Sequence, residues 1–417
     1  MPRSCLVLLA IMLACFPVSA RADGITELER GVAMARQGQW PLALRYFRAA
    51  HSEMPGDAAV MLNLGLVYDR MGGHEAEAIA WFRAYLAAAP GAGNVNKVKA
   101  RITEIDAALD VRIQQLLDVA RRILGELSAP REKTAVLSAM MRAYAEAGDI
   151  AAAQSLERQV PPGGGKPDWG IAAVAAAQAR RGDFPGARAE AGRPGAEAVR
   201  SWALAEVAVE QARRDDFAAA AQTAETIVNR DEMSYARSRI AALMARRGNV
   251  DGAIALADRI DGDSDPAAKA VALAVISSAL VRAGDAGKGA ESLAEAEKNL
   301  ARAPAGAGRS LAQAVTVAAR SVSFPETSEA AALAELGEPS SRARFLRDLA
   351  AARGDAALTA VFRWVVVAHD ISSGDSSDIP RLMEVARTET PVKSGITVAT
   401  AAAAAAQALA RVREQSR

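Results

Sequence analysis

The stretch ARRGDFPGARAE, residues 179–190, returns in altered form as ARRDDFAAAAQT from Ala212 and as ARRGNVDGAIAL from Ala245. Each copy carries a glycine or aspartate where a turn would fall. With one flanking copy on either side, the turn positions are spaced 34, 33, 33 and 36 residues apart, at Gly148, Gly182, Asp215, Gly248 and Gly284. This period is typical of solenoids that stack pairs of antiparallel helices. We therefore predict an all-α superhelix.

The residues around each turn support helix pairs. One place after every turn stands a residue that can cap a helix: Asp149, Asp183, Asp216, Asn249 and Asp285. Small residues, which let two helices approach closely, occupy fixed places on both sides of the turn. Five places after it they are Ala153, Ala187, Ala220, Ala253 and Gly289; seven places before it they are Ala175, Ala208, Ala241 and Ser277, with Met141 as the exception. Ile227 and Ile260 are expected to face the next pair.

Composition favours the same fold class. Hydrophobic residues make up 51% of the 417-residue chain and aromatic residues only 4%. This alanine-rich mixture favours helices, because strands are enriched in β-branched and aromatic side chains. The formal net charge is +1, from 50 basic and 49 acidic residues. No global field would draw such a chain to nucleic acid or an acidic membrane surface, so neither is predicted as a partner.

The N-terminal sequence MPRSCLVLLAIMLACFPVSARADG is typical of a secretory signal peptide. A short basic head precedes an apolar run over residues 5–16, which is too short for a membrane span. Cleavage after Ala20 or Ala22 fits the small residues there, and we favour Ala22. A lipoprotein would instead use Cys15, although the residues before it are a poor approach to a lipidated cysteine. We expect a periplasmic protein without a transmembrane segment once residues 1–22 are removed.

Candidate residues for catalysis or metal binding are scarce. Cys5 and Cys15 both fall in the removable segment, so the mature chain would have no thiol, disulfide or cysteine-ligated metal. His51, His74 and His369 lie too far apart in sequence for a local metal-binding pattern and are expected at the surface or at helix ends. We predict no catalytic residue, no metal and no cofactor.

Two short motifs are better explained as loops. The run Pro161–Gly165 resembles a phosphate-binding loop, but Pro167 follows Lys166 where serine or threonine is required. Residues 374–376, Gly-Asp-Ser, match part of an esterase motif that belongs after a strand, and no strand is predicted. Aromatic residues two places after a turn are expected in the core between helices: Trp40, Phe184 and Phe217.

A known family becomes recognisable near the mature N-terminus. Residues 24–57 contain Gly31, Gly38, Ala43, Phe47, Ala50 and Pro55, and residues 58–92 contain Leu64, Gly65, Tyr68, Gly72, Ala78, Phe82 and Pro90. This pattern resembles the tetratricopeptide repeat, a helix pair of about 34 residues. The departures are Glu27 for tryptophan, Arg30 for leucine, Met34 for tyrosine, Tyr85 for a small residue, and one inserted residue near Gly73.

The resemblance is clear over residues 24–110, where the charged segment 94–109 looks like the helix that usually caps such repeats. Beyond it, period, turns and small residues carry the pattern. Ala352–Asp355 marks one more unit, and residues 397–412 form a terminal helix of alanines too weakly hydrophobic for a membrane span. The predicted organisation is a signal peptide over 1–22, a tetratricopeptide-repeat domain with its cap over 23–110, degenerate repeats over 111–301, and an irregular helical region over 302–417.

The function predicted from this architecture is a non-enzymatic scaffold or adaptor in the bacterial cell envelope, because stacked helix pairs form an extended surface for a peptide or protein segment. The alternative is an exported enzyme, or enzyme subunit, that acts on cell-wall material from a helical superhelix. Such transglycosylases carry a separate globular catalytic domain, and no stretch here supplies one. Pathway, partner and oligomeric state do not follow from the residues.

The resemblance also implies a peptide-binding groove lined by the first helix of each unit. Its expected residues are Val32, Arg36, Leu62, Asn63, Leu66, Asp69, Arg70, Lys97 and Arg101. The four basic side chains would hold an acidic side chain or a C-terminal carboxylate, with apolar contact from Leu62 and Leu66. The family's carboxylate clamp is matched at Asn63 alone, since Leu28 and Val32 replace its lysine and asparagine. The alternative is that the basic residues form a solvated helix face.

Overall fold

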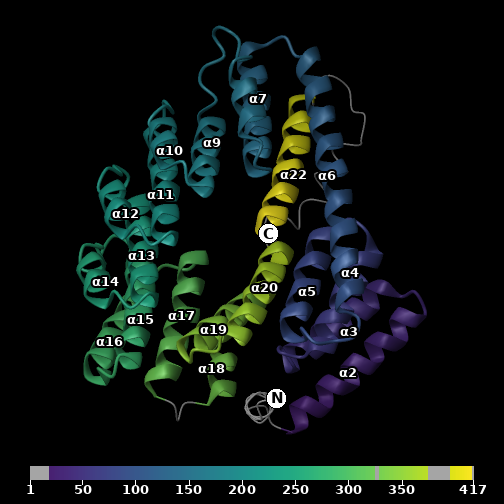
Figure 1. Ribbon diagram of the computed structural model, residues 1–417, viewed down its shortest axis with the longest axis vertical. Helices are drawn as coiled ribbons and strands as arrows, with labels where there is room; N and C mark the ends of the chain where they lie inside the picture. The colour runs from purple at the N-terminus through teal and green to yellow at the C-terminus, as the bar shows by residue number, and fades with distance from the viewer. Residues whose placement is uncertain (1–17, 325–327, 374–394, 416–417) are drawn as a thin grey trace. The chain divides into compact units, whose positions relative to one another are not determined.

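The computed structural model describes residues 18–324, 328–373 and 395–415, which form 20 helices and no strand (Figure 1). The predicted all-α fold of stacked helix pairs is confirmed. The chain divides into two compact units. Unit 1 joins the residues up to Asp106 with Gln313–Ser372, and unit 2 joins Ala107–Ala312 with the residues from Ser373 onward. The predicted domain boundaries, which follow the order of the sequence, stay a prediction, and the predicted cleavage site depends on residues that lie partly outside the described part.

In each of the first two helix pairs of unit 1, an aromatic ring on the second helix packs against a glycine on the first helix. The pairs are α2 (Val18–Arg36) with α3 (Trp40–Glu53) and α4 (Ala58–Met71) with α5 (Glu75–Ala88). A Cβ added at Gly31 would clash with the ring of Phe47, and one at Gly65 with the ring of Phe82. Both phenylalanines are fully buried. Glycine is therefore required at these two crossings because the ring occupies the space of a side chain.

The remaining helices of unit 1 come from both ends of its sequence. They are the first part of α6 (Val95–Glu126), the second part of α17 (Ala307–Ser323), α18 (Glu329–Glu335), α19 (Pro339–Ala352) and α20 (Ala356–Ser373). The extra unit predicted at residues 352–355 is present, since Gly354 has a φ of 74° and Asp355 accepts a hydrogen bond from the backbone of Leu358 at 2.9 Å.

The predicted end of the capping helix is wrong. We expected it over residues 94–109, but α6 has 32 residues and ends at Glu126. From the expected end onward, Leu109, Ile113, Leu117 and Ala120 are buried at helical spacing. The helix continues because its apolar stripe continues.

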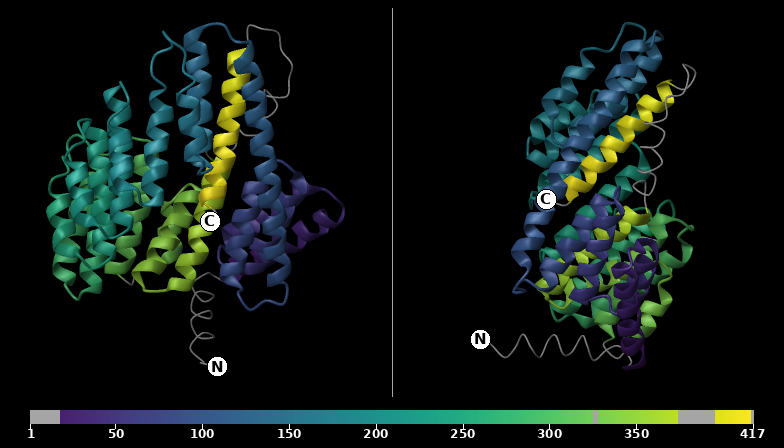
Figure 2. Two further views of the ribbon diagram at one scale, coloured as in Figure 1. Left: turned by 45° about the horizontal axis from the view of Figure 1, so that its top comes forward. Right: turned by 90° about the vertical axis from the view of Figure 1, so that its right-hand side faces the viewer.

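Unit 2 alternates long first helices with mostly short second ones. Its elements after α6 are α7 (Pro130–Glu146), α8 (Ile150–Glu157), α9 (Asp168–Arg181), α10 (Phe184–Ala191), α11 (Glu197–Arg213), α12 (Phe217–Ala224), α13 (Arg230–Arg246), α14 (Val250–Ala257), α15 (Pro266–Arg282), α16 (Ala286–Arg302), the first part of α17, and α22 (Gly395–Gln415). The alanine-rich α22, drawn in yellow, packs along α7 (Figure 2). No helix in the described ranges has the length and apolarity to cross a membrane.

The turn chemistry predicted for unit 2 is confirmed at every repeat. All five turn residues have positive φ, between 64° and 90°, and Asp215 is the single non-glycine residue with positive φ among those described. Each following side chain accepts a backbone hydrogen bond at the start of the second helix: Asp149, Asp183, Asp216, Asn249 and Asp285. The predicted small residues on both helices are buried, as are Ile227 and Ile260.

The second arginine of the recurring Ala-Arg-Arg motif ties each repeat to the one before it. Arg181 donates to the carbonyl oxygen of Gly148, and Arg214 donates to that of Arg180 at 2.7 Å. Arg247 places its Nε 2.9 Å from the carboxylate of Asp215. These three links span 33, 34 and 32 residues, so the period of the repeat recurs as a physical contact between consecutive turns.

Candidate peptide-binding site

The predicted groove residues lie on three consecutive first helices of unit 1. Val32 and Arg36 are on α2, the five residues from Leu62 to Arg70 are on α4, and Lys97 and Arg101 are on α6. Contact between α2 and α4 makes the first two helices direct neighbours. The arrangement predicted for the helices is therefore present, and the individual side chains decide what it can bind.

Arg101 already has a carboxylate partner. Its Nε and Nη2 atoms donate to the two oxygens of Asp69, at 2.9 and 2.8 Å, and its Nη1 donates to Glu104 at 2.6 Å. These hydrogen bonds raise the pKa of Arg101, and those to Asp69 contribute the most. A bidentate pair of this kind links α4 to α6. Asp69 and Arg101 are therefore held by each other, which lowers the positive charge that the groove offers.

Three of the four basic groove residues remain available. Arg36, Arg70 and Lys97 are exposed and form no side-chain hydrogen bond or ion pair with the described residues. Leu66 is 43% exposed beside them. The amide of Asn63 donates to the carbonyl oxygen of Ala59 in its own helix at 2.8 Å, and Leu62 and Val32 are partly buried.

Comparison with known families supports the architecture of this region. A tetratricopeptide repeat family model matches residues 34–102. This segment is a tetratricopeptide-repeat region. The match spans the helices that carry all the predicted groove residues except Val32. The comparison with curated proteins found no match to the chain.

A buried histidine pair in unit 1 was not predicted. His51 on α3 is 6% exposed, and its ring lies 5.4 Å from that of His369 on α20 and 4.8 Å from that of Trp81 on α5. Burial lowers the pKa of His51 well below its usual value, and that of His369 to about 4. His51 lies in the last turn of α3, which agrees with the helix-end expectation, but it is not at the surface, because α20 packs over the outer helices of the repeats.

The sequence of α5 indicates that a further helix covers the outer side of the repeats. Residues 76–82 of α5 are all buried, and α5 is apolar on almost every side. A helix that is hydrophobic all round requires cover on both faces, which a two-layer repeat alone does not provide. The histidine pair is neutral, and the described residues contain no cluster of three or more potential metal ligands.

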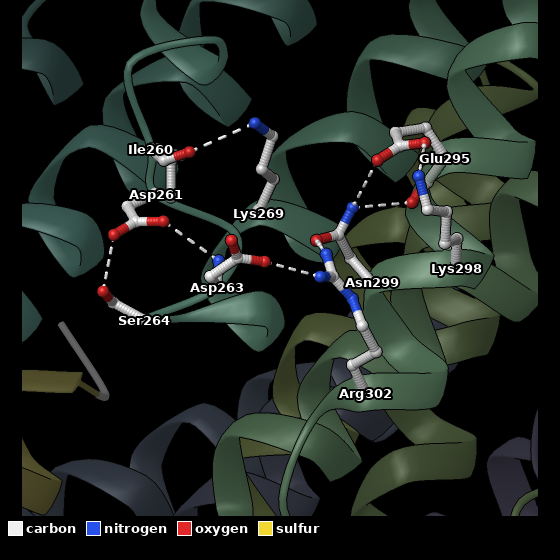
Figure 3. Close-up of polar contacts among 9 residues, drawn as sticks. All are labelled: Ile260, Asp261, Asp263, Ser264, Lys269, Glu295, Lys298, Asn299 and Arg302. Atoms are coloured by element: carbon white, nitrogen blue, oxygen red, sulfur yellow. Dashed lines mark hydrogen bonds and ion pairs between the residues drawn. The ribbon is translucent and has the colours of Figure 1, made fainter.

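An acidic loop in unit 2 has the alternating aspartates of a calcium loop but a different geometry (Figure 3). The carboxylate of Asp261 accepts from Ser264 at 2.6 Å and from the backbone of Asp263 at 3.0 Å, which lowers the pKa of Asp261. Asp263 pairs with Arg302 of α16 at 2.7 Å, and Asp265 caps α15. The three carboxylates serve separate partners, so the loop joins α14 and α15 to α16.

The glycine run also forms a loop, as predicted. Gly163 and Gly165 have φ values of 80° and 82°, and Lys166 donates to the carbonyl oxygen of Arg193 at 3.0 Å. The Gly-Asp-Ser motif at residues 374–376 lies outside the described residues. Of the predicted aromatic core residues, Phe184 packs against the cluster of buried alanines on α9–α11.

Proposed function

We propose that the protein is an exported, non-catalytic scaffold that binds an acidic or C-terminal peptide segment of a partner in the bacterial cell envelope. The observation that carries this proposal is the face formed by Arg36, Arg70 and Lys97 beside the exposed Leu66, within a tetratricopeptide-repeat region. Cations without an internal partner attract carboxylates, and the apolar contact adds affinity that is independent of charge.

Binding is tested with the chain from Asp23 and a fluorescent peptide that ends in Leu-Asp-Asp with a free carboxylate. Lys97→Glu should weaken binding about tenfold, since a lost charge-assisted hydrogen bond costs about 1.5–3 kcal/mol. The matched control is Lys99→Glu, which changes the charge equally two residues away on the same helix and should bind as the unmodified protein does. Equal affinity of both variants would remove the groove from the proposal.

Export is tested separately by fusing residues 1–22 to a phosphatase that is active only outside the bacterial cytoplasm. We expect phosphatase activity, and its loss when Leu8 and Leu9 in the apolar run are replaced by arginine. An inactive fusion would contradict the envelope location while leaving the binding result intact. Release of cell-wall fragments by the pure protein would contradict the non-catalytic role.

A further inference from the structure

Three aromatic side chains recur at one position of the repeats in unit 2. Trp169, Trp202 and Tyr235 follow one another at intervals of 33 residues, and each precedes the turn residue of its repeat by 13. They lie on α9, α11 and α13, the first helices of three consecutive repeats, and each of these helices contacts the next. We call these three residues the aromatic row.

Two members of the aromatic row are exposed, while the third, Trp202, packs partly against the buried core. Trp169 is 47% exposed and Tyr235 is 40% exposed, and the rings of Trp169 and Trp202 meet edge to face with centroids 5.6 Å apart. The buried core beneath them consists of alanines and valines. Large aromatics that repeat in register on a surface are typical of interaction sites.

Two carboxylates without partners flank the row. Glu206 stands one helical turn after Trp202, and Glu232 stands three residues before Tyr235. Neither carboxylate forms a hydrogen bond or ion pair with a described residue. Burial raises the pKa of both, and repulsion from Glu206 contributes to the rise at Glu232. Both groups therefore sit where a cation would relieve the cost of desolvation.

The neighbouring basic groups leave this excess of acid in place. Arg213 pairs with Glu210, and Arg180 lies 3.7 Å from Glu146. Arg239 also faces Glu206 and has no ion pair with a described residue. Two unpaired carboxylates against this one arginine make the surface complementary to a cationic ligand.

We propose that the aromatic row with Glu206 and Glu232 binds an extended, arginine-bearing segment of a partner protein. A guanidinium group stacks on aromatic faces and pairs with carboxylates, and both kinds of group are present on adjacent helices. Neighbouring helices pack about 8–10 Å apart, which is about three residues of an extended chain, so one segment can reach all three repeats. This site goes beyond the proposed function, because the basic groove is in unit 1 and takes a ligand of opposite charge.

The test uses the mature protein and a fluorescent peptide of repeated Gly-Arg-Ser triplets, with citrulline replacing arginine in a second peptide. Citrulline keeps the shape of arginine and removes its charge. We expect the arginine peptide to bind at least about tenfold more tightly than the citrulline peptide, as one lost charge-assisted contact implies. The variants Glu206→Gln with Glu232→Gln, and Tyr235→Leu, should each weaken the arginine peptide to a similar degree.

Glu291→Gln is the matched control, since it removes one exposed carboxylate from α16 in the same unit and should leave binding unchanged. Circular dichroism shows whether each variant keeps its helices. Lys97→Glu, which tests the basic groove, should not alter arginine-peptide binding, so the two proposals fail independently. Equal binding of the arginine and citrulline peptides, no binding of the arginine peptide at millimolar concentration, or unaltered binding by the folded row variants would overturn the proposal.

Discussion

The helix pairs of the tetratricopeptide-repeat region and those of the degenerate repeats close in different ways. In unit 1, the rings of Phe47 and Phe82 fill the space above Gly31 and Gly65. In unit 2, the place equivalent to Phe47, nine residues after the turn residue, holds fully buried alanines such as Ala224 and Ala257. An alanine buries far less apolar surface than a phenylalanine, so each crossing in unit 2 gains less from the hydrophobic effect.

Side-chain capping of the second helices is weaker in the tetratricopeptide-repeat region than in the degenerate repeats. The second helices of the first two pairs, α3 and α5, have no side-chain cap at Gln39 or His74. All five second helices from α8 to α16 are capped by Asp or Asn. A cap contributes about 1 kcal/mol. The comparison indicates that the helix-pair geometry tolerates a shift from aromatic packing to capped turns and small residues.

The largest expected difference between the two units is in how their stability depends on pH. The three histidines of the chain all belong to unit 1. The lowered pKa values of His51 and His369 mean that folded unit 1 binds fewer protons than its unfolded form, so this stability is present above about pH 6.5 and is lost as the pH falls. His369, with a pKa of about 4, accounts for a loss of about 3 kcal/mol by pH 4, and His51 adds to it.

Other groups act in the opposite direction. Raised pKa values at His74 and Asp370 in unit 1 give stability at low pH and offset part of the loss, and those of Glu190, Glu206 and Glu232 favour unit 2 in acid. Hydrogen exchange at pH 7 and pH 5, corrected for intrinsic rates, should show lower opening free energies in α3, α5 and α20 and not in α11 or α13. Equal losses in both units would contradict the prediction, and His369→Gln should reduce the loss in unit 1.

The periodic features were predictable because each depends on residues close in sequence. A positive-φ turn, a capping side chain and small residues at a crossing belong to one repeat, and their spacing recurs in the sequence at Gly182, Asp215 and Gly248. The aromatic row also recurs in the sequence at 33-residue intervals. This interval alone does not show whether the side chains lie in the core or on the surface, because a periodic aromatic residue on a first helix fits both. The exposures of Trp169 and Tyr235 decide between them.

Contacts between distant segments were not predictable from a period. His51 meets His369, and α7 meets α22, with no repeat that relates the two partners. A solenoid in which each repeat contacts only its neighbours predicts neither. The resemblance to the family was enough to place the groove residues on the first helices. It did not predict the pairing of Arg101 with Asp69, because that pairing depends on side-chain geometry between α4 and α6.

The alanine crossings of unit 2 should resist enlargement. Ala220→Leu adds a branched side chain at a fully buried position of α12 and should destabilise unit 2 by about 1–3 kcal/mol through overpacking. The control is Ala218→Leu, two residues earlier on the same helix and exposed, which should change the free energy of unfolding by less than about 0.5 kcal/mol. Urea denaturation measures both. If Ala220→Leu is as stable as the control, alanine does not set the distance between these helices.

The smallest expected effect tests whether capping matters more where aromatic packing is absent. Asp183 accepts a hydrogen bond from the backbone of Gly186 at 3.0 Å, and Asp183→Ala leaves that donor without its partner at the start of α10. We expect a loss of about 1 kcal/mol in urea denaturation. Asp183→Asn keeps an oxygen acceptor and should recover most of the lost stability.

At the equivalent place before α3, Gln39 makes no cap, so Gln39→Ala should change stability by less than about 0.5 kcal/mol. Equal effects of Asp183→Ala and Gln39→Ala would show that the caps add nothing specific to the degenerate repeats. A larger effect at Asp183 would support the exchange of aromatic packing for turn chemistry, because both substitutions remove a polar side chain from the same place in the helix pair and differ in whether that side chain holds a backbone N–H.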